Sequence, residues 1–286
     1  MKVGAVIILY HPQIAHLEKM INKLNEINWP VVLVDNSPVP LSHQNFNVKY
    51  IHCPANVGIA AAQNDGIQAL QDMGAEYGLV LDQDSQLTEE LLFGLLSEYQ
   101  SATHHFTQVA AIGPMIVCEF NNAPVQPRLQ KALQLKDGLA EVRQIIASGM
   151  LINLSMFNAI GKKDEALFID GVDHEWCWRA RYKGFSIVQS HNIKMRHRQG
   201  DARHRILGLN FKRGAPVRLY YQVRNVLILS RRQYVPLYWK CRHLPVLPLR
   251  WAVNRWWFPE GKLRGHYVLR GLIDGIKGRT GKIDSM

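Results

Sequence analysis

Two aspartates, one residue apart, follow an apolar run that is typical of a buried strand. In YGLVLDQDSQLTEELL, residues 77–92, the run ends at Asp82 and Asp84. Mg²⁺ and Mn²⁺ commonly use one or two protein carboxylates together with phosphate oxygens of a substrate. The alternative is capping of the next helix, a task that Ser85 or Thr88 could fill unaided. The spacing favours a site for a divalent metal ion.

A third aspartate ends another apolar run. Asp35 closes the strand-like segment in VVLVDNS. Ligands of open parallel sheets bind beyond the carboxyl ends of the strands, so Asp35 and Asp82 are expected to face one crevice. Taken alone, an aspartate at a strand end is also a common turn former. The later stretch NVGIAAAQNDGI, residues 56–67, contains a glycine and small residues that allow close approach of the backbone to a ligand.

Acids and tryptophans gather in FIDGVDHEWCWRARYKG, residues 168–184. A carboxylate held beside apolar rings can act as a general base. On a helix, Glu175 and Arg179 are four residues apart and can pair, which leaves Asp173 free at the helix start. The alternative is a helix-capping aspartate with a surface ion pair.

The elements that position these residues alternate along the first part of the chain. Apolar, β-branched runs at 3–10, 31–35 and 78–82 predict strands, and helical spacing over 14–24 and 59–70 predicts helices. This alternation predicts an α/β fold with a mostly parallel central sheet that helices flank.

The next part of the chain is harder to assign. The stretch 103–145, with IGPMIV and the polar loop CEFNNAPVQPR, is expected to be less regular. The run ASGMLINLSMFNAIG predicts another apolar element. Residues 176–183 predict a helix that Gly184 ends, and FSIVQS predicts a strand.

Composition limits the class of protein. The 286 residues, 47% of them hydrophobic, suffice for one large domain or for a domain with an appendage. The four cysteines contain no CxxC pair, which indicates a reducing compartment without a disulfide framework or a zinc site. The first apolar segment is too short for a membrane span and lacks a cleavage site, so we expect a cytoplasmic protein.

Charge is distributed unevenly over a net value of +11. Residues 179–286 hold 24 lysines and arginines against four acids, whereas residues 1–178 hold 10 against 19. This asymmetry favours a polyanionic partner such as phospholipid, nucleic acid or a pyrophosphate-bearing substrate. A solvated cationic surface is the alternative.

Beyond residue 205, cations are interleaved with tryptophan, tyrosine and aliphatic residues, and prolines divide the sequence into short elements. Helices of this composition are suited to a lipid interface, although a helical subdomain packed on the first part is the alternative. We therefore expect an enzyme-like domain over 1–204 and a basic, aromatic-rich helical region over 205–286.

These motifs, in this order, resemble family 2 inverting glycosyltransferases of the GT-A fold. The resemblance rests on VLVDNS, NVGIAAAQNDGI, LVLDQDS and FIDGVDHEWCWRARYKGF, and it covers roughly residues 3–200. DQDS and VDHEWCWRA are similar to the bacterial rhamnosyltransferases that build O-antigen and related polysaccharides, as in lipopolysaccharide biosynthesis. His11 departs from the usual asparagine after the first strand, and Val172 stands where the base motif often has glutamate.

The resemblance implies roles in donor binding for five residues. Asp35 would hydrogen-bond the pyrimidine base of the donor, a dTDP- or UDP-sugar. Asn56, Gly58 and Asn64 would line the nucleotide pocket, and Asp82 would contact the ribose or the sugar.

The resemblance also implies a metal ion and a base. Asp84, as part of a DXD motif, would hold Mg²⁺ or Mn²⁺ on the donor diphosphate, with His197 close to the metal. Asp173 would be the general base. The acceptor and phosphate side would be shaped by Glu175, Trp176 and Arg179.

In such an enzyme a single in-line displacement inverts the anomeric centre, so dTDP-β-L-rhamnose would give an α-L-rhamnoside. The implied acceptor is a saccharide on polyprenyl diphosphate. The protein would act peripherally on the inner face of the bacterial cell membrane, where residues 205–286 would meet an anionic surface.

Other functions stay open. One alternative is another nucleotide-sugar transferase of the same fold, which would transfer galactose or glucose from a UDP-sugar. A sugar-phosphate nucleotidyltransferase usually has a glycine-rich loop with arginine or lysine after the first strand, which LYHPQIAHLEK lacks. A non-enzymatic nucleic-acid-binding protein would explain the basic region, but no recognised nucleic-acid motif occurs, so we expect no nucleic-acid partner.

Overall fold

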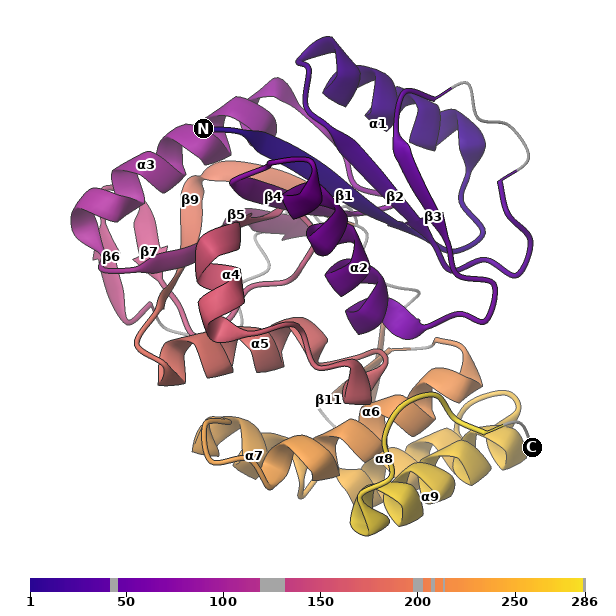
Figure 1. Ribbon diagram of the computed structural model, residues 1–286. Helices are drawn as coiled ribbons and strands as arrows, with labels where there is room; N and C mark the ends of the chain where they lie inside the picture. The colour runs from indigo at the N-terminus through magenta and orange to yellow at the C-terminus, as the bar shows by residue number, and fades with distance from the viewer. Residues whose placement is uncertain (42–45, 119–131, 198–202, 207–208, 213, 285–286) are drawn as a thin grey trace.

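The computed structural model describes the chain apart from residues 42–45, 119–131, 198–202, 207–208, 213 and 285–286. Its main sheet has the strand order β3-β2-β1-β4-β8-β5-β9-β7-β6, and helices cover both faces (Figure 1). The helices near the C-terminus form a further layer beneath α5 in this view. The predicted α/β class is confirmed.

Four parallel strands form one half of the sheet. These strands and their helices are β1 (Val3–Leu9), α1 (Ile14–Glu26), β2 (Val31–Asp35), β3 (Lys49–His52), α2 (Gly58–Asp72) and β4 (Tyr77–Asp82). In the parallel ladders, Leu9 lies opposite Asp35 and Ile8 lies opposite Asp82. The ends of β2 and β4 therefore flank the end of β1, and the predicted strands and helices of this half are confirmed.

The other half of the sheet is mixed. It contains β5 (Val109–Cys118), β6 (Gln134–Lys136), β7 (Leu139–Glu141), β8 (Met150–Asn153) and β9 (Ser186–His197). β5 pairs with β9 in parallel, whereas β8 is antiparallel to both β4 and β5. β7 is antiparallel to β9 and β6.

The expectation of irregular structure over 103–145 was wrong, because this stretch contains the long strand β5. Gly113 and Pro114 weaken the sequence signal of a strand. The β5–β9 ladder accommodates them with a register shift between Gly113 and Met115. Most of the polar loop CEFNNAPVQPR lies outside the described residues.

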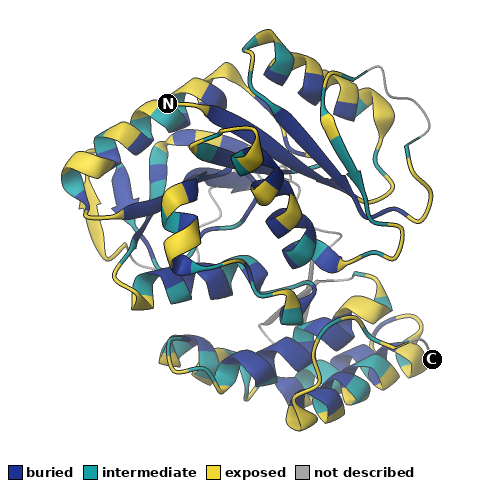
Figure 2. Cartoon of the chain, in the orientation of Figure 1, coloured by how far each residue is buried: buried dark blue, intermediate teal, exposed yellow. Residues whose placement is uncertain are grey.

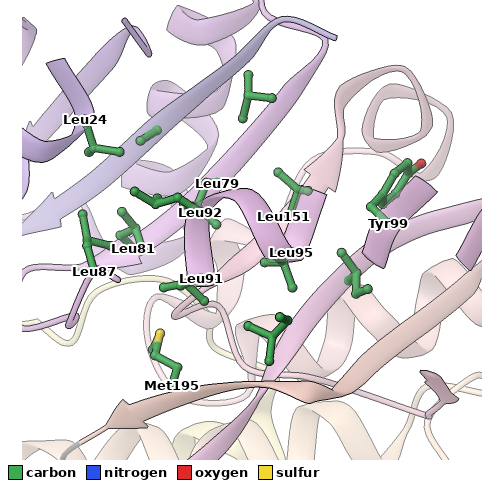
Figure 3. Packing of buried hydrophobic residues seen from close by; sticks show 14 of the residues in the cluster. Leu24, Leu79, Leu81, Leu87, Leu91, Leu92, Leu95, Tyr99, Leu151 and Met195 are labelled. Atoms are coloured by element: carbon green, nitrogen blue, oxygen red, sulfur yellow. The ribbon is translucent and has the colours of Figure 1, made fainter. Parts of the chain in front are cut away.

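Two apolar clusters fill the space between the sheet and its helices (Figure 2). One joins the strands to α1, to the π-helical turn η1 (Glu90–Gly94) and to α3 (Leu95–His105). Figure 3 shows leucines of this cluster packed together, among them Leu79 of β4, Leu91 of η1 and Leu95 of α3. The other cluster lies on the opposite face, under α2, α4 (Leu154–Ile160) and α5 (Val172–Tyr182).

Helix α5 confirms the prediction for the acid- and tryptophan-rich motif. It ends with Lys183 as the C-cap, and Gly184 adopts φ +90°, a conformation that favours glycine. The 3-10 turn η2 (Glu165–Leu167) precedes it. A two-stranded ribbon, β10 (Arg203–Ile206) and β11 (Leu209–Lys212), leads to the C-terminal helices.

The C-terminal helices share a third apolar core with the α/β part. They are α6 (Pro216–Ser230), α7 (Leu237–His243), α8 (Leu247–Trp256) and α9 (Gly261–Lys277). Val223 and Trp239 from this layer cluster with Val172 and Trp178 of α5. Gly271 lets α9 approach α6 closely, since a Cβ there would lie 2.6 Å from the carbonyl oxygen of Tyr220. The predicted boundary at residue 204 stays a prediction.

Buried polar side chains of α6 also fasten the two parts together. The Asn225 amide donates to the carbonyls of Leu167, Ile169 and Asp170 at 3.0, 2.7 and 2.9 Å. Arg224, which is fully buried, donates to the Leu167 carbonyl at 3.0 Å. These contacts fix the segment that leads into α5.

We expect Asn225→Ala to lower the free energy of unfolding by about 2–3 kcal/mol, because it removes a buried amide together with its hydrogen bonds to the carbonyls of Ile169 and Asp170. Urea unfolding measures the change. Val217→Ala, at an exposed position of the same helix, should change stability by less than about 0.5 kcal/mol. Equal stability of the two variants would contradict the fastening role of Asn225.

Candidate active site

The DQDS turn is closed by its own serine. The Asp82 N–H donates to Ser85 Oγ at 3.0 Å, and the Ser85 N–H donates to the Asp82 carbonyl at 3.0 Å. The next helical turn is capped by Thr88, whose Oγ1 accepts from the Leu91 N–H at 3.1 Å. Asp84 is exposed and forms no hydrogen bond or ion pair with the described residues. Capping therefore does not account for Asp84.

The turn is also held against the end of β1. Gln83 Oε1 accepts from the Tyr10 N–H at 2.7 Å, and its Nε2 donates to the Tyr10 carbonyl at 3.1 Å. One residue further, the His11 N–H donates to Ser37 Oγ at 2.8 Å. These contacts tie the ends of β1, β2 and β4 together.

Asp35 is fully buried, and both of its carboxylate oxygens have partners. Oδ1 accepts from the Ser37 N–H at 2.9 Å, and Oδ2 accepts from the Tyr50 hydroxyl at 2.8 Å. Burial and the hydrogen bond to Asp35 raise the pKa of Tyr50 to about 12. Asp35 thus shapes the turn after β2, and its contact with a nucleobase stays a prediction.

Asn56 and Gly58 form the turn at which α2 begins. Asn56 has φ +48° and accepts from the Gly58 N–H at 3.1 Å. Gly58 has φ +85°, and a Cβ there would lie 2.6 Å from the ring of Phe168. Packing against Phe168 is therefore one reason for this glycine, and the nucleotide contact of both residues is untested.

Asn64 contacts the segment before α5. It is buried, its amide donates to the Lys163 carbonyl at 2.9 Å, and the Lys163 N–H donates back to Oδ1 at 2.9 Å. It also donates to Glu165 Oε1 at 2.8 Å. The structure gives Asn64 a role in positioning Lys163. The nucleotide contact that the resemblance implied for Asn64 stays a prediction.

Asp173 lies in the first turn of α5 and is anchored through both oxygens. Lys163 Nζ lies 2.9 Å from Oδ1, and the Ala147 N–H donates to Oδ2 at 3.1 Å. The expectation that Asp173 is free was wrong, because the buried ammonium of Lys163 pairs with it. The Asp173 side chain is 24% exposed, and each oxygen retains a lone pair for a further donor.

The DQDS turn and Asp173 are joined through two consecutive residues. Ser85 Oγ hydrogen-bonds Ser148 Oγ at 2.9 Å, and the adjacent residue Ala147 holds Asp173. Both serines are buried. The aspartates of the two motifs, far apart in the sequence, are therefore brought together by a direct chain of contacts.

The residues expected on the acceptor side form contacts inside the protein. The predicted pair is confirmed, since Arg179 Nε donates to Glu175 Oε1 at 2.8 Å. Arg179 also donates to the carbonyl of Ile160 at 2.9 Å and so caps the end of α4. Trp176 is buried and stacks on Phe157, with ring centroids 5.7 Å apart.

A hollow of about 530 Å³ opens beside this network. Its arginines are already paired, Arg179 with Glu175 and Arg232 with Asp164. The Tyr234 hydroxyl donates to Glu175 Oε1 at 2.7 Å. The hollow is thus lined by a closed network of ion pairs.

Arg218 of α6 is a site residue that the motifs do not reveal. Its guanidinium donates to both oxygens of Asp170, each at 2.9 Å. Asp170, and then Asp82 by its charge, raise the pKa of Arg218. A cation from the C-terminal helices is therefore placed against the segment before α5, and half of its side chain is exposed.

A metal ion at this edge would need ligands beyond the described side chains. The described residues contain no group of three histidines, cysteines or acids that could hold one. His197 is the last residue of β9 and lies opposite Cys118, and its side chain lies outside the described part. The exposed carboxylate of Asp84 suits a hard cation that also binds phosphate oxygens.

A parallel half-sheet with aspartates at its strand ends, joined to an anchored carboxylate on a following helix, defines a GT-A type of glycosyltransferase. The model of the family "Glycosyl transferase family 2" matches residues 5–160. The chain belongs to this family and is a glycosyltransferase that uses a nucleotide-sugar donor.

Two curated relatives match over most of their length. The chain is 33% identical to a dTDP-rhamnosyl transferase of Shigella flexneri, over 97% of this chain and 96% of the relative. It is 27% identical to a low-salt glycan biosynthesis hexosyltransferase of Haloferax volcanii, over 89% and 85% of the two chains.

Solved structures confirm the fold. GalNAc-T7, determined with UDP, GalNAc and Mn²⁺, aligns with a TM-score of 0.58 at 13% identity. The alignment covers 97% of this chain and 56% of that chain. TarS of S. aureus, residues 1–349, aligns with a TM-score of 0.51 at 14% identity, over 96% and 81% of the chains.

We expect Lys163→Met to lower kcat for sugar transfer by about 10- to 100-fold, because Asp173 loses one of its two anchors. Dissociation of the nucleotide sugar, measured by calorimetry, should change less than about twofold. Asp173→Asn is the reference and should abolish transfer while donor binding persists. An unchanged kcat in Lys163→Met would contradict the positioning role of the lysine.

Proposed function

We propose that this glycosyltransferase transfers L-rhamnose from dTDP-β-L-rhamnose to a saccharide linked to polyprenyl diphosphate, in the synthesis of a cell-surface polysaccharide. The observation that carries the donor assignment is 33% identity over nearly the full length to a dTDP-rhamnosyl transferase. The arrangement of Asp84, Arg218 and Asp173 supports the chemistry. Transfer of another hexose is the alternative, since a relative at 27% identity is a hexosyltransferase.

In the proposed mechanism, Asp173 receives the proton of the acceptor hydroxyl as that oxygen attacks the anomeric carbon. Lys163 and the Ala147 N–H hold the carboxylate plane in place, so the lone pairs that face solvent are presented in a fixed direction. The site needs no second carboxylate as a nucleophile, because a single displacement inverts the anomeric centre.

The donor diphosphate would lie at the end of β4. Asp84, with His197 as a further ligand, would hold Mg²⁺ or Mn²⁺, which would neutralise charge on the leaving diphosphate. The charge of Asp82 acts on Arg218, so the guanidinium could supply a second positive charge on this side. Asp35, Asn56 and the backbone near Gly58 would receive the nucleoside.

The C-terminal helices would rest on an anionic membrane surface. Among the described residues, no helix combines the length and apolarity that crossing a bilayer requires. Trp256 and Trp257 are 69% and 68% exposed, and Leu269, Ile273 and Ile276 are exposed at spacings of four and three along α9. Lys262 and Lys277 lie in the first and last turns of α9, which suits peripheral contact on the cytoplasmic side.

A thermal-shift panel of nucleotide sugars tests the donor. With Mg²⁺ or Mn²⁺, dTDP-rhamnose should raise the melting temperature more than UDP-glucose or UDP-galactose. A ligand that binds only the folded state raises the melting temperature more when its affinity is higher. A larger shift with a UDP-hexose would favour the alternative donor.

We expect Asp84→Asn to remove the dependence of turnover on Mg²⁺ or Mn²⁺ together with at least about 99% of activity. Asp72→Asn is the matched control, since Asp72 is exposed on α2 and bonds only Gln68 in the described structure. Full metal-stimulated turnover in Asp84→Asn would show that the cation binds elsewhere.

The double variant Trp256→Ser, Trp257→Ser should sediment about tenfold less with anionic liposomes than the parent protein at low salt. Phe93→Ser removes a similarly exposed ring from the α/β part and should sediment like the parent. The bound fraction should fall as salt rises. Equal sedimentation of all three proteins would contradict contact through α8.

A further inference from the structure

A row of rings and cations runs from α5 to α7 and α8. His174, which follows Asp173 in the sequence, lies 5.8 Å from Trp178 between ring centroids. Trp178 lies 5.2 Å from Trp239, and Trp239 lies 4.5 Å from His243. The row therefore connects the neighbour of the proposed base with the end of α7.

Arg250 of α8 adds a positive charge to this row without a matching acid. It forms no ion pair with the described residues, and its hydrogen bond to Gln222 is long, at 3.5 Å. Burial lowers the pKa of Arg250, and the acid whose charge acts on it is Asp170. Both oxygens of Asp170 already accept from Arg218. The charge of Arg250 is only partly compensated.

The same excess of positive charge affects the pKa of His243. Burial, followed by Arg250, Arg242 and His174, lowers the pKa of His243 to about 4. Its ring is therefore neutral at pH 7. A half-buried guanidinium that has no ion pair among the described residues is unfavourable for stability unless an anion binds there.

We propose that Arg250, together with His243 and His174, binds the diphosphate of the acceptor lipid. This inference rests on the proposed function, in which the acceptor sugar is carried on polyprenyl diphosphate. The donor diphosphate is assigned to Asp84 and Arg218, so each diphosphate would have an arginine of its own.

The position of Arg250 along α8 supports this assignment. The acceptor sugar must reach Asp173, which precedes His174, and the lipid must reach the membrane beside Trp256 and Trp257. Six to seven residues of helix separate Arg250 from these tryptophans, a rise of about 10 Å. The sequence of groups in the molecule, sugar then diphosphate then lipid, matches the sequence of binding residues on the protein.

Steady-state kinetics with two acceptors tests the proposal. One acceptor carries its saccharide on a short polyprenyl diphosphate, and the other carries the same saccharide on an uncharged alkyl chain. We expect Arg250→Gln to raise KM for the diphosphate acceptor by about 10- to 100-fold, and to change KM for the neutral acceptor and for the donor less than about twofold.

Arg279→Gln is the matched control, because it removes a guanidinium that is 60% exposed in the same part of the chain. It should leave all three KM values unchanged. An equal rise for both acceptors in Arg250→Gln would mean that the arginine is structural, and a rise for the donor alone would assign it to the other diphosphate. Either result would overturn the proposal.

A second measurement does not depend on turnover. Inorganic pyrophosphate, added without metal, should raise the pKa of His243 by NMR titration, and Arg250→Gln should reduce that rise. Pyrophosphate that leaves His243 unaffected would overturn the proposal. Absence of transfer to any polyprenyl diphosphate acceptor by the parent protein would instead refute the proposed function, and this titration would still test the anion site.

Discussion

The position of the proposed base depends on one short segment, residues 163–171, which is fastened from two directions. Asn64 of α2 holds its start through both backbone groups of Lys163. Asn225 of α6 holds its end through three carbonyls. Since Lys163 lies at one end of the segment and α5 begins at the other, the Lys163–Asp173 ion pair joins two points that are each fixed independently.

This arrangement gives the C-terminal helices a role beyond that of an appendage. The charge asymmetry of the sequence is partly balanced inside the protein, because arginines of the C-terminal helices pair with acids of the α/β part. Arg218 pairs with Asp170, and Arg232 pairs with Asp164. Arg224 has another use, since its buried guanidinium donates to backbone carbonyls. A basic region can thus reflect complementarity within one protein as well as attraction to a polyanion.

The sequence predicted the features that depend on local periodicity and on strand ends. The parallel strands that end at Asp35 and Asp82, and the helix that carries Asp173, follow from apolar runs and from the rule for ligand sites in open sheets. Strand β5 could not be predicted in the same way, because Pro114 interrupts its pattern and a register shift with a distant strand restores it.

Contacts between segments that are far apart in the sequence could not be predicted from local sequence patterns either. Lys163 follows no periodic pattern, and a lysine in KKDE is more often solvated than buried. Arg218 lies outside every motif and reaches the site only because α6 docks there. Gly58 has a clear local signature, but its packing against Phe168, more than 100 residues away in the sequence, could not be predicted from it.

Backbone strain is consistent with this view of the segment. Phe168 and Asp170 adopt φ of +63° and +65°, a conformation that disfavours residues other than glycine, asparagine or aspartate. Such conformations cost about 1–3 kcal/mol each and persist where surrounding contacts fix them. Here the Asn225 amide binds the carbonyl of Asp170, and the ring of Phe168 stacks on Tyr221 with centroids 4.8 Å apart. The strained turn places Asp170 against Arg218, and the charge of Asp170 also acts on Arg250, so one aspartate of this segment acts on both arginines to which the proposed diphosphates are assigned.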